Sequence, residues 1–330
     1  MLSAFALLFW LLFRAGHGVM ILVAGIVIAV LIDAAVRRIP LPRKLALVLF
    51  LLAVLLAFAG LSWWTGAAFA DQLEGVRERA LEGWPRVQAW MNERSWGRRI
   101  LEETAQLKWS AQAGGRVGDM AFAAIGGIAT LLLVPIFGVF FALSPKQYID
   151  PLMHLLPESR RARVREVVVA TGHALRSWFV GRFVSMTVVG LGTGLGLWAA
   201  GVPMPAGLGV IAGLLSFVPN VGPLLAAIPG VLVGLSESPS TALWAVAVYV
   251  GIQGIDNYLV SPFVDQRSVD VPPATQLGAQ LLLGFAAGGI GVFLATPLMI
   301  IIIVAVQALY VQDVLHDRVR LLGEHGEPPK

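Results

Sequence analysis

Three polar side chains lie close together near the end of an apolar stretch: Gln253, Asp256 and Asn257, in the segment GIQGIDNYLVSP. In a helix, all three fall within about one turn of each other. Carboxylate and amide groups at that spacing could coordinate a monovalent cation or a polar solute, and the carboxylate could also exchange a proton. The sequence supports equally an interfacial helix cap before the turn at Pro262.

A second set of candidates interrupts the uncharged stretch 207–235. Pro219, Asn220, Gly222 and Pro223 stand at its centre, and proline removes a backbone donor and clashes with the preceding turn. Irregular backbone inside a membrane persists only where protein buries it or where it lines a wet cavity, and transporters bind substrates at such breaks. We expect Pro219, Gly222 and Pro223 to free main-chain groups on a transport path, and Asn220 to supply side-chain hydrogen bonds.

The stretch 277–304 repeats this character, because it is uncharged and is split by Gly288, Gly289 and Gly291. Two topologies fit the pair of broken stretches. Each could cross the membrane once, or each could be a re-entrant hairpin, which makes the two halves inverted repeats. The turn at Glu237 has no Lys or Arg and fits better outside, so the sequence favours the hairpins.

Composition indicates an all-α, polytopic membrane protein: 57% of residues are apolar and 13% are charged, and the mean hydropathy is +0.79. The net charge of +4 does not indicate a nucleic-acid partner, because the basic residues lie in short connections that orient membrane helices. Asp33 and Arg37 are expected to form an interfacial i,i+4 ion pair. Gly190, Gly192, Gly194 and Gly196 predict close helix packing rather than a nucleotide loop.

The chain divides by composition into successive parts. Its predicted parts are N-terminal transmembrane helices in 1–64, with a short first span at 2–13; an extracytoplasmic helical insert, 65–118; a transmembrane helix, 119–144; a cytoplasmic amphipathic region, 145–180; a transport core, 181–311; and a cytoplasmic tail, 312–330. Within the insert, Pro85 predicts a helix break.

Several functions are not expected. The absence of cysteine rules out disulfides, thiolate metal sites and cysteine nucleophiles. The histidines at 17, 154, 173, 316 and 325 form no i,i+4 pair, so no metal site is predicted. No P-loop is present, and no nucleophile and base pair stands out. The sequence therefore predicts neither an enzyme nor a cofactor.

The order of these parts, together with the segments SFVPNVGPLLAAIPGV, IDNYLVSP and GGIGVFLATPL, resembles the autoinducer-2 exporter (AI-2E) family of bacterial inner-membrane proteins. Pro219, Gly222 and Pro223 match the first family motif, in which Asn220 stands at a position that is often aromatic. The second motif is an acidic residue and Asn followed by proline.

Asp256, Asn257 and Pro262 match that second motif. The resemblance implies a homo-oligomeric carrier in the inner membrane, without ATPase parts, that exports a small polar signalling molecule. It also implies sodium or lithium exchange against protons in some members. We therefore predict a secondary transporter for an autoinducer-2-like solute, with the lipid bilayer as its surroundings and the C-terminus in the cytoplasm.

Two alternatives remain open. One is a Na+(Li+)/H+ antiporter in which Asp256 carries the proton, so that the partners are a monovalent cation and a proton. The other is a non-transporting membrane scaffold that binds a partner through the insert or the helix around Arg160.

Overall fold

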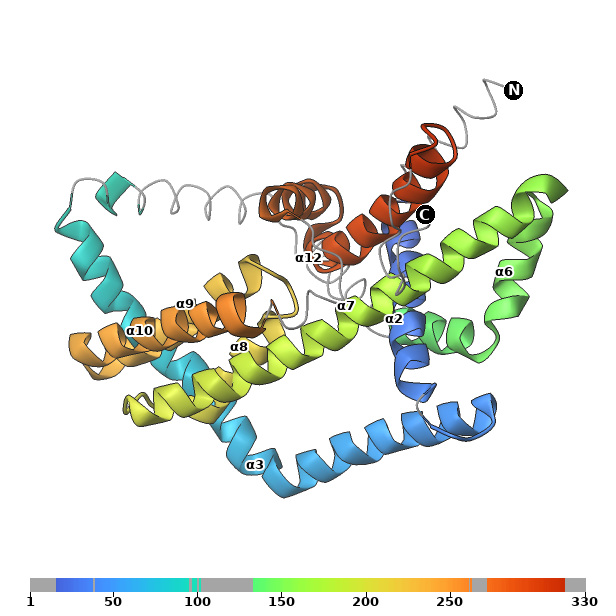
Figure 1. The fold of residues 1–330 in the computed structure, drawn as a ribbon. Helices are drawn as coiled ribbons and strands as arrows, with labels where there is room; N and C mark the ends of the chain where they lie inside the picture. The colour runs from blue at the N-terminus through green and yellow to red at the C-terminus, as the bar shows by residue number, and fades with distance from the viewer. Residues whose placement is uncertain are drawn as a thin grey trace, which may run out of the picture. The chain divides into compact units, whose positions relative to one another are not determined.

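The computed structural model describes residues 16–37, 39–94, 97–99, 101, 133–260, 262 and 272–317 (Figure 1). All regular structure in these ranges is helical, and no strand occurs in them. Four helices there are long and apolar enough to cross a membrane: Gly18–Val36, Glu158–Ala199, Pro239–Val260 and Pro273–Gln312. The prediction of an all-α, polytopic membrane protein is confirmed.

Some predicted parts lie outside the described residues. They are the first span at 2–13, the distal part of the insert at 102–118, the first part of the span at 119–144, the connection at 263–271 and the tail from 318.

The chain forms two compact units. Unit 1 comprises Met1–Ala57, Thr130–Arg182 and Pro262–Lys330, and unit 2 comprises Phe58–Ala129 and Phe183–Ser261. Two long helices, α3 (Arg43–Asn92) and α7 (Glu158–Ala199), contribute to both units.

Unit 1 contains α2 (Gly16–Val36), the first part of α3, the helix Leu133–Leu143, α6 (Pro145–His154) and the first part of α7. It ends with α12 (Pro273–Val306) and the π-helical turn η2 (Gln307–Gln312). The helix Leu133–Leu143 approaches α2 closely, since a Cβ on Gly25 would lie 2.6 Å from the Cβ of Phe137. A small apolar core joins α2, α3 and this helix: Ala29, Ile32, Val36, Ala46, Leu47 and Ala142.

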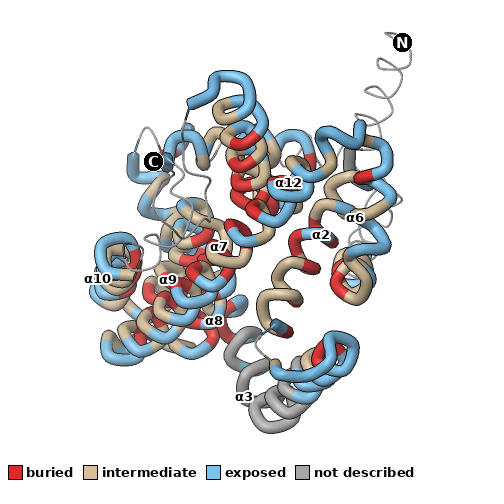
Figure 2. Tube along the Cα trace, turned by 45° about the vertical axis from the view of Figure 1, so that its right-hand side comes forward, coloured by how far each residue is buried: buried red, intermediate tan, exposed pale blue. Residues whose placement is uncertain are grey.

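Unit 2 contains the second parts of α3 and α7, then α8 (Pro205–Leu215), α9 (Val221–Glu237), α10 (Pro239–Ile255) and the π-helical turn η1 (Asp256–Val260). Figure 2 shows buried residues along α8 and α9, whereas much of α10 is exposed. The exposed residues of α10 include Leu243, Trp244 and Val250. Large apolar side chains outside the core are what a helix facing lipid requires.

The predicted glycine packing in α7 is confirmed. Gly190 and Gly194 contact the backbone of α8 so closely that a Cβ on Gly209 would lie 2.7 Å from the carbonyl oxygen of Gly190. On the other side of the same helix, a Cβ on Gly192 would lie 2.9 Å from Ile252 of α10. The small residues therefore let α7 pack between α8 and α10.

A predicted helix break is absent. The helix α3 continues through Pro85, so the predicted break there is wrong. Both Pro85 and Leu81, the residue whose carbonyl loses its donor, are exposed, so the disrupted hydrogen bond lies outside the packed core. Single helices also run across two divisions that composition predicted between parts of the chain: α3 across 64–65 and α7 across 180–181.

Candidate functional site

The first predicted break is present. The helices α8 and α9 pack against each other and are joined by a turn at 216–220. Asn220, the last residue of that turn, has φ 64° and ψ −54°, a region that side-chain-bearing residues rarely adopt. Pro223 follows within the first turn of α9, where a missing backbone donor costs little.

Gly222 makes the turn possible. A Cβ at this position would overlap the carbonyl oxygen of Leu215, the last residue of α8. The backbone amide of Gly222 is not freed by the turn, because its N–H donates to the carbonyl oxygen of Val218 at 2.9 Å. Glycine here serves a close approach of backbone to backbone.

Both ends of the α8–α9 hairpin lie against one stretch of α3. At the start of the hairpin, a Cβ on Gly75 would lie 2.5 Å from the side chain of Met204. At its end, Gly83 packs on the carbonyl of Leu232, Arg79 pairs with Glu237, and Arg86 donates to the carbonyl oxygen of Leu235. A cation at the C-terminal carbonyls of α9 also complements the helix dipole.

Asp256 is a buried acid in unit 2, with 3% of its surface exposed. The hydroxyl of Ser185, on α7, donates to Asp256 Oδ1 at 2.7 Å. Gln253 does not share this contact; its amide donates to Asn257 Oδ1 at 2.9 Å. The predicted trio therefore separates into a buried Asp256–Ser185 pair and a more exposed Gln253–Asn257 pair.

The turn at 216–220 and Asp256 lie toward the same end of the antiparallel helices α9 and α10. Gly230 of α9 packs on the ring of Tyr249 of α10. From that contact, Gly222 and Asp256 are each about 11 Å along their helices. In α8, a Cβ on Gly213 would lie 2.9 Å from the carbonyl oxygen of Met186, next to Ser185. The fold therefore brings the first motif and Asp256 of the second motif to one level of unit 2.

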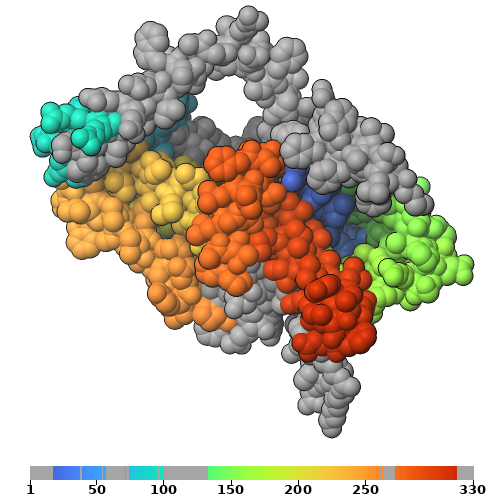
Figure 3. Space-filling model, turned by 90° about the horizontal axis from the view of Figure 1, so that it is seen from above, coloured from blue at the N-terminus to red at the C-terminus, as the bar shows by residue number. Residues whose placement is uncertain are grey.

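The second predicted break is also present, in unit 1. Gly288 has φ 62° and ψ −146° inside α12 and divides it into two arms. Figure 3 shows the surface of α12 in orange to red. The arms fold back on each other, since a Cβ on Gly291 would overlap the carbonyl oxygen of Leu283. The amide of Gln276 donates to Thr296 Oγ1 at 3.0 Å across the arms. Gly288 and Gly289 are exposed and Gly291 is buried.

Sequence reasoning did not predict Ser185, which lies 71 residues before its partner Asp256. Its signal was a hydroxyl in an otherwise apolar stretch, which alone does not identify a partner. The last residue of the second motif, Pro262, is exposed and belongs to unit 1. Among the described residues, no group of three or more His, Cys, Asp or Glu could hold a metal ion.

Comparison with known proteins identifies the chain's relatives. Residues 1–311 match the model of the AI-2E family transporter. Over 182 residues the chain is 29% identical to "Putative transport protein YueF" of Bacillus subtilis, covering 55% of this chain and 49% of that protein. It is 27% identical over 202 residues to "Putative permease PerM" of Escherichia coli, covering 59% and 57%.

The chain thus spans about half the length of these curated relatives. The family match, however, extends through both broken segments and the Asp256 motif. The protein belongs to the AI-2E family of membrane transporters.

Proposed function

We propose that this protein is a secondary transporter in which Asp256 binds the cation or proton that drives movement of a small polar solute. The observation that carries the proposal is the burial of Asp256 among apolar helices, with Ser185 as its hydrogen-bond donor. No Lys, Arg or His of the described residues forms an ion pair with Asp256. An acid of this kind inside membrane helices is costly, and it commonly serves ion or proton movement.

The position of Asp256 supports the same proposal. It begins the π-helical turn η1, and π-helical turns often occur at functional sites. The broken connection 216–220 lies toward the same end of unit 2, with the side chain of Asn220 exposed. A solute would meet Asn220 and the Gln253–Asn257 pair, while Asp256 holds the coupling ion. Export of an autoinducer-2-like molecule by a homo-oligomer in the bacterial inner membrane is the finer form of this proposal.

A re-entrant α8–α9 hairpin fits the contacts with α3. The contacts to both hairpin ends fall between Gly75 and Arg86 of α3, which is about 17 Å of helix. A bilayer core is about 30 Å thick, which supports an arrangement with both ends at one face of the membrane. If the insert is extracytoplasmic, the Glu237 turn is on that side too.

Cysteine labelling tests this topology, because the chain has no native cysteine. A cysteine at Ser238 is expected to react in whole cells with a thiol reagent that does not cross the inner membrane. Reaction only with reagents that enter the cytoplasm would overturn the re-entrant arrangement. That result would not bear on the role of Asp256 in ion coupling, which the flux experiment tests separately.

Flux in proteoliposomes tests the function. We expect an imposed sodium or proton gradient to drive solute flux, and Asp256→Asn to lower that flux at least tenfold because the amide cannot carry the charge. Asp150→Asn is the control, since Asp150 is a half-exposed acid paired with Arg165. Full gradient-driven flux in Asp256→Asn would contradict the proposal.

The buried carboxylate also favours a second function, Na+(Li+)/H+ antiport. This function predicts cation–proton exchange without any organic solute, with a steep pH dependence that Asp256→Asn removes. If the protein is instead a scaffold that transports nothing, neither solute flux nor cation–proton exchange is expected. In that case, deleting the insert should abolish the cellular phenotype, and Asn220→Leu should leave it intact.

A further inference from the structure

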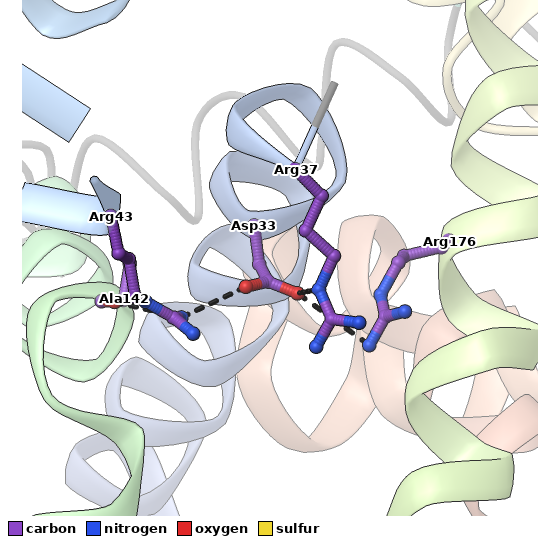
Figure 4. Close-up of polar contacts among 5 residues, drawn as sticks. All are labelled: Asp33, Arg37, Arg43, Ala142 and Arg176. Carbon is purple, nitrogen blue, oxygen red and sulfur yellow. Dashed lines mark hydrogen bonds and ion pairs between the residues drawn. The ribbon is translucent and has the colours of Figure 1, made fainter. Parts of the chain in front are cut away.

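A cluster of arginines in unit 1 has no role in the proposed transport. It consists of Arg37, Arg43 and Arg176, which surround the carboxylate of Asp33 (Figure 4). The predicted pair is confirmed, since Arg37 Nε donates to Asp33 Oδ2 at 2.8 Å. The structure adds Arg43 and Arg176, so three guanidinium groups face one carboxylate.

The three arginines differ in how many of their N–H groups have a hydrogen-bond acceptor. Arg43 Nη2 donates to Asp33 Oδ1 at 2.8 Å and to the carbonyl oxygen of Ala142 at 3.0 Å. Arg176 Nη2 lies 3.5 Å from Asp33 Oδ2, and Arg176 Nε is buried without a hydrogen-bond partner among the described residues. A buried donor left without an acceptor is destabilising.

Arg37 provides the accessible part of the cluster. Its side chain is 58% exposed, against 20% for Arg176. In Figure 4 the guanidinium groups of Arg37 and Arg176 lie side by side, with Arg43 on the other side of Asp33. Two adjacent cations that share a single carboxylate oxygen form a place where a second anion is favourable.

We propose that Arg37 and Arg176 bind a phosphate group, and that its source is the headgroup of an anionic phospholipid. Paired guanidinium groups match the geometry of phosphate oxygens. The site lies at the end of the candidate span Gly18–Val36, and the adjoining Leu41 and Leu45 are 42% and 49% exposed. Basic pockets between membrane helices at the lipid headgroup level bind anionic lipids. Soluble phosphate is the other possible source of the same group.

A neighbouring glycine gives Arg176 its position. A Cβ on Gly172, one turn earlier in α7, would lie 3.3 Å from Arg176 Nη2. The guanidinium therefore lies along α7 in the space that Gly172 leaves open. With this orientation, Arg176 Nη2 lies 3.5 Å from Asp33 Oδ2.

Lipid binding by the full-length protein tests the proposal. In nanodiscs or by native mass spectrometry, wild-type protein should bind phosphatidylglycerol more tightly than phosphatidylcholine. Arg176→Gln and Arg37→Gln should each weaken that preference about tenfold, as expected for loss of a charge-assisted hydrogen bond. Arg165→Gln is the matched control, because Arg165 lies on the same helix, is exposed and pairs with Asp150 at 2.9 Å; its preference should not change.

A second variant changes binding in the opposite direction. Asp33→Asn removes the competing carboxylate, so phosphatidylglycerol should bind more tightly than in the wild type. A cluster that only holds helices together would not give this gain. The test therefore remains decisive if Arg176→Gln fails to fold.

The source of the phosphate is separated by titrating inorganic phosphate into protein in phosphatidylcholine nanodiscs. Saturable phosphate binding that requires Arg176 would support the site, with soluble phosphate as its ligand. A phosphatidylglycerol preference that requires Arg176, without saturable phosphate binding, would support the lipid headgroup as the ligand. The proposal is overturned if the wild type prefers neither ligand. It is overturned equally if Arg176→Gln and Asp33→Asn leave the lipid preference unchanged.

Discussion

The two broken segments turn back on themselves through the same kind of backbone contact. In each, a glycine after the break lies against the carbonyl of a leucine before it: Gly222 on Leu215, and Gly291 on Leu283. They differ at the break itself. The α8–α9 hairpin turns through Asn220, a residue with a side chain at φ 64°, whereas α12 turns through Gly288 at φ 62°.

The segments also differ in how their arms are held. The α8–α9 hairpin is held from outside, because Arg79 and Arg86 of α3 contact the end of α9. In α12 the connection is internal, through the hydrogen bond from Gln276 to Thr296. The difference indicates that α12 can form its bend with its own residues, whereas the position of the first hairpin depends on α3.

The largest expected effect comes from adding a methyl group at the shared glycines. Gly222→Ala and Gly291→Ala should each lower the free energy of unfolding by about 3 kcal/mol, because the new Cβ meets a backbone carbonyl that cannot move alone. Denaturation by SDS measures this change. The controls are Gly251→Ala and Gly278→Ala, at helical sites with no heavy atom within 4 Å of an added Cβ. Equal stability of all four variants would show that the breaks do not depend on close backbone contact.

The next largest effect is expected from substitutions at the residue with positive φ in each break. Gly288→Ala should cost about 2 kcal/mol of unfolding free energy, because φ 62° with ψ −146° is accessible almost only to glycine. Asn220→Gly should not destabilise the turn, since glycine adopts φ 64° more easily than asparagine. Gly289→Ala, with an open site and no positive φ, is the control. A tolerated Gly288→Ala would mean that α12 is not held in this bend.

The sequence was sufficient to predict both breaks and the helical class. At the two breaks, glycine, with proline at the first, acts on the local backbone, so the position of each break could be predicted from its own segment. Where a helix continues through a proline was harder to predict. Pro85 indicated an end to a helix that in fact continues, because the exposed surroundings of Pro85 tolerate the lost hydrogen bond.

The candidate site was predictable only in part. Helical spacing placed Gln253, Asp256 and Asn257 together, but it did not indicate that Asp256 points to another helix. The partner Ser185 precedes it by 71 residues, and a contact that distant depends on the packing of α7 against α10. The same holds for Arg176, whose proximity to Asp33 no local pattern indicates.

The internal connection of α12 should contribute less than the glycine contacts. Thr296→Val should lower the unfolding free energy by about 1 kcal/mol, the usual net value of a hydrogen bond. Gln276→Leu provides the other side of a double-mutant cycle, and a coupling near 1 kcal/mol would assign the effect to this pair. A coupling of zero would mean that the arms are held by apolar packing alone. In either case, the first hairpin should be unaffected.

The smallest effect is expected at the outer contact of the first hairpin. Arg79 and Glu237 are 36% and 46% exposed, so Arg79→Gln should change the unfolding free energy by about 0.5 kcal/mol. The position of the hairpin end is the more sensitive measurement, because a weak contact can still select one arrangement. Arg77→Gln is the control, since Arg77 pairs only weakly, at 3.6 Å, with Glu74 of its own helix. If α3 positions this hairpin, Arg79→Gln should increase labelling of a cysteine at Ser238, and the exchanged pair Arg79→Glu with Glu237→Arg should restore the wild-type rate. If Arg79→Gln leaves the labelling rate unchanged, the Arg79–Glu237 contact does not position the first hairpin. The two segments would then differ only at their turns.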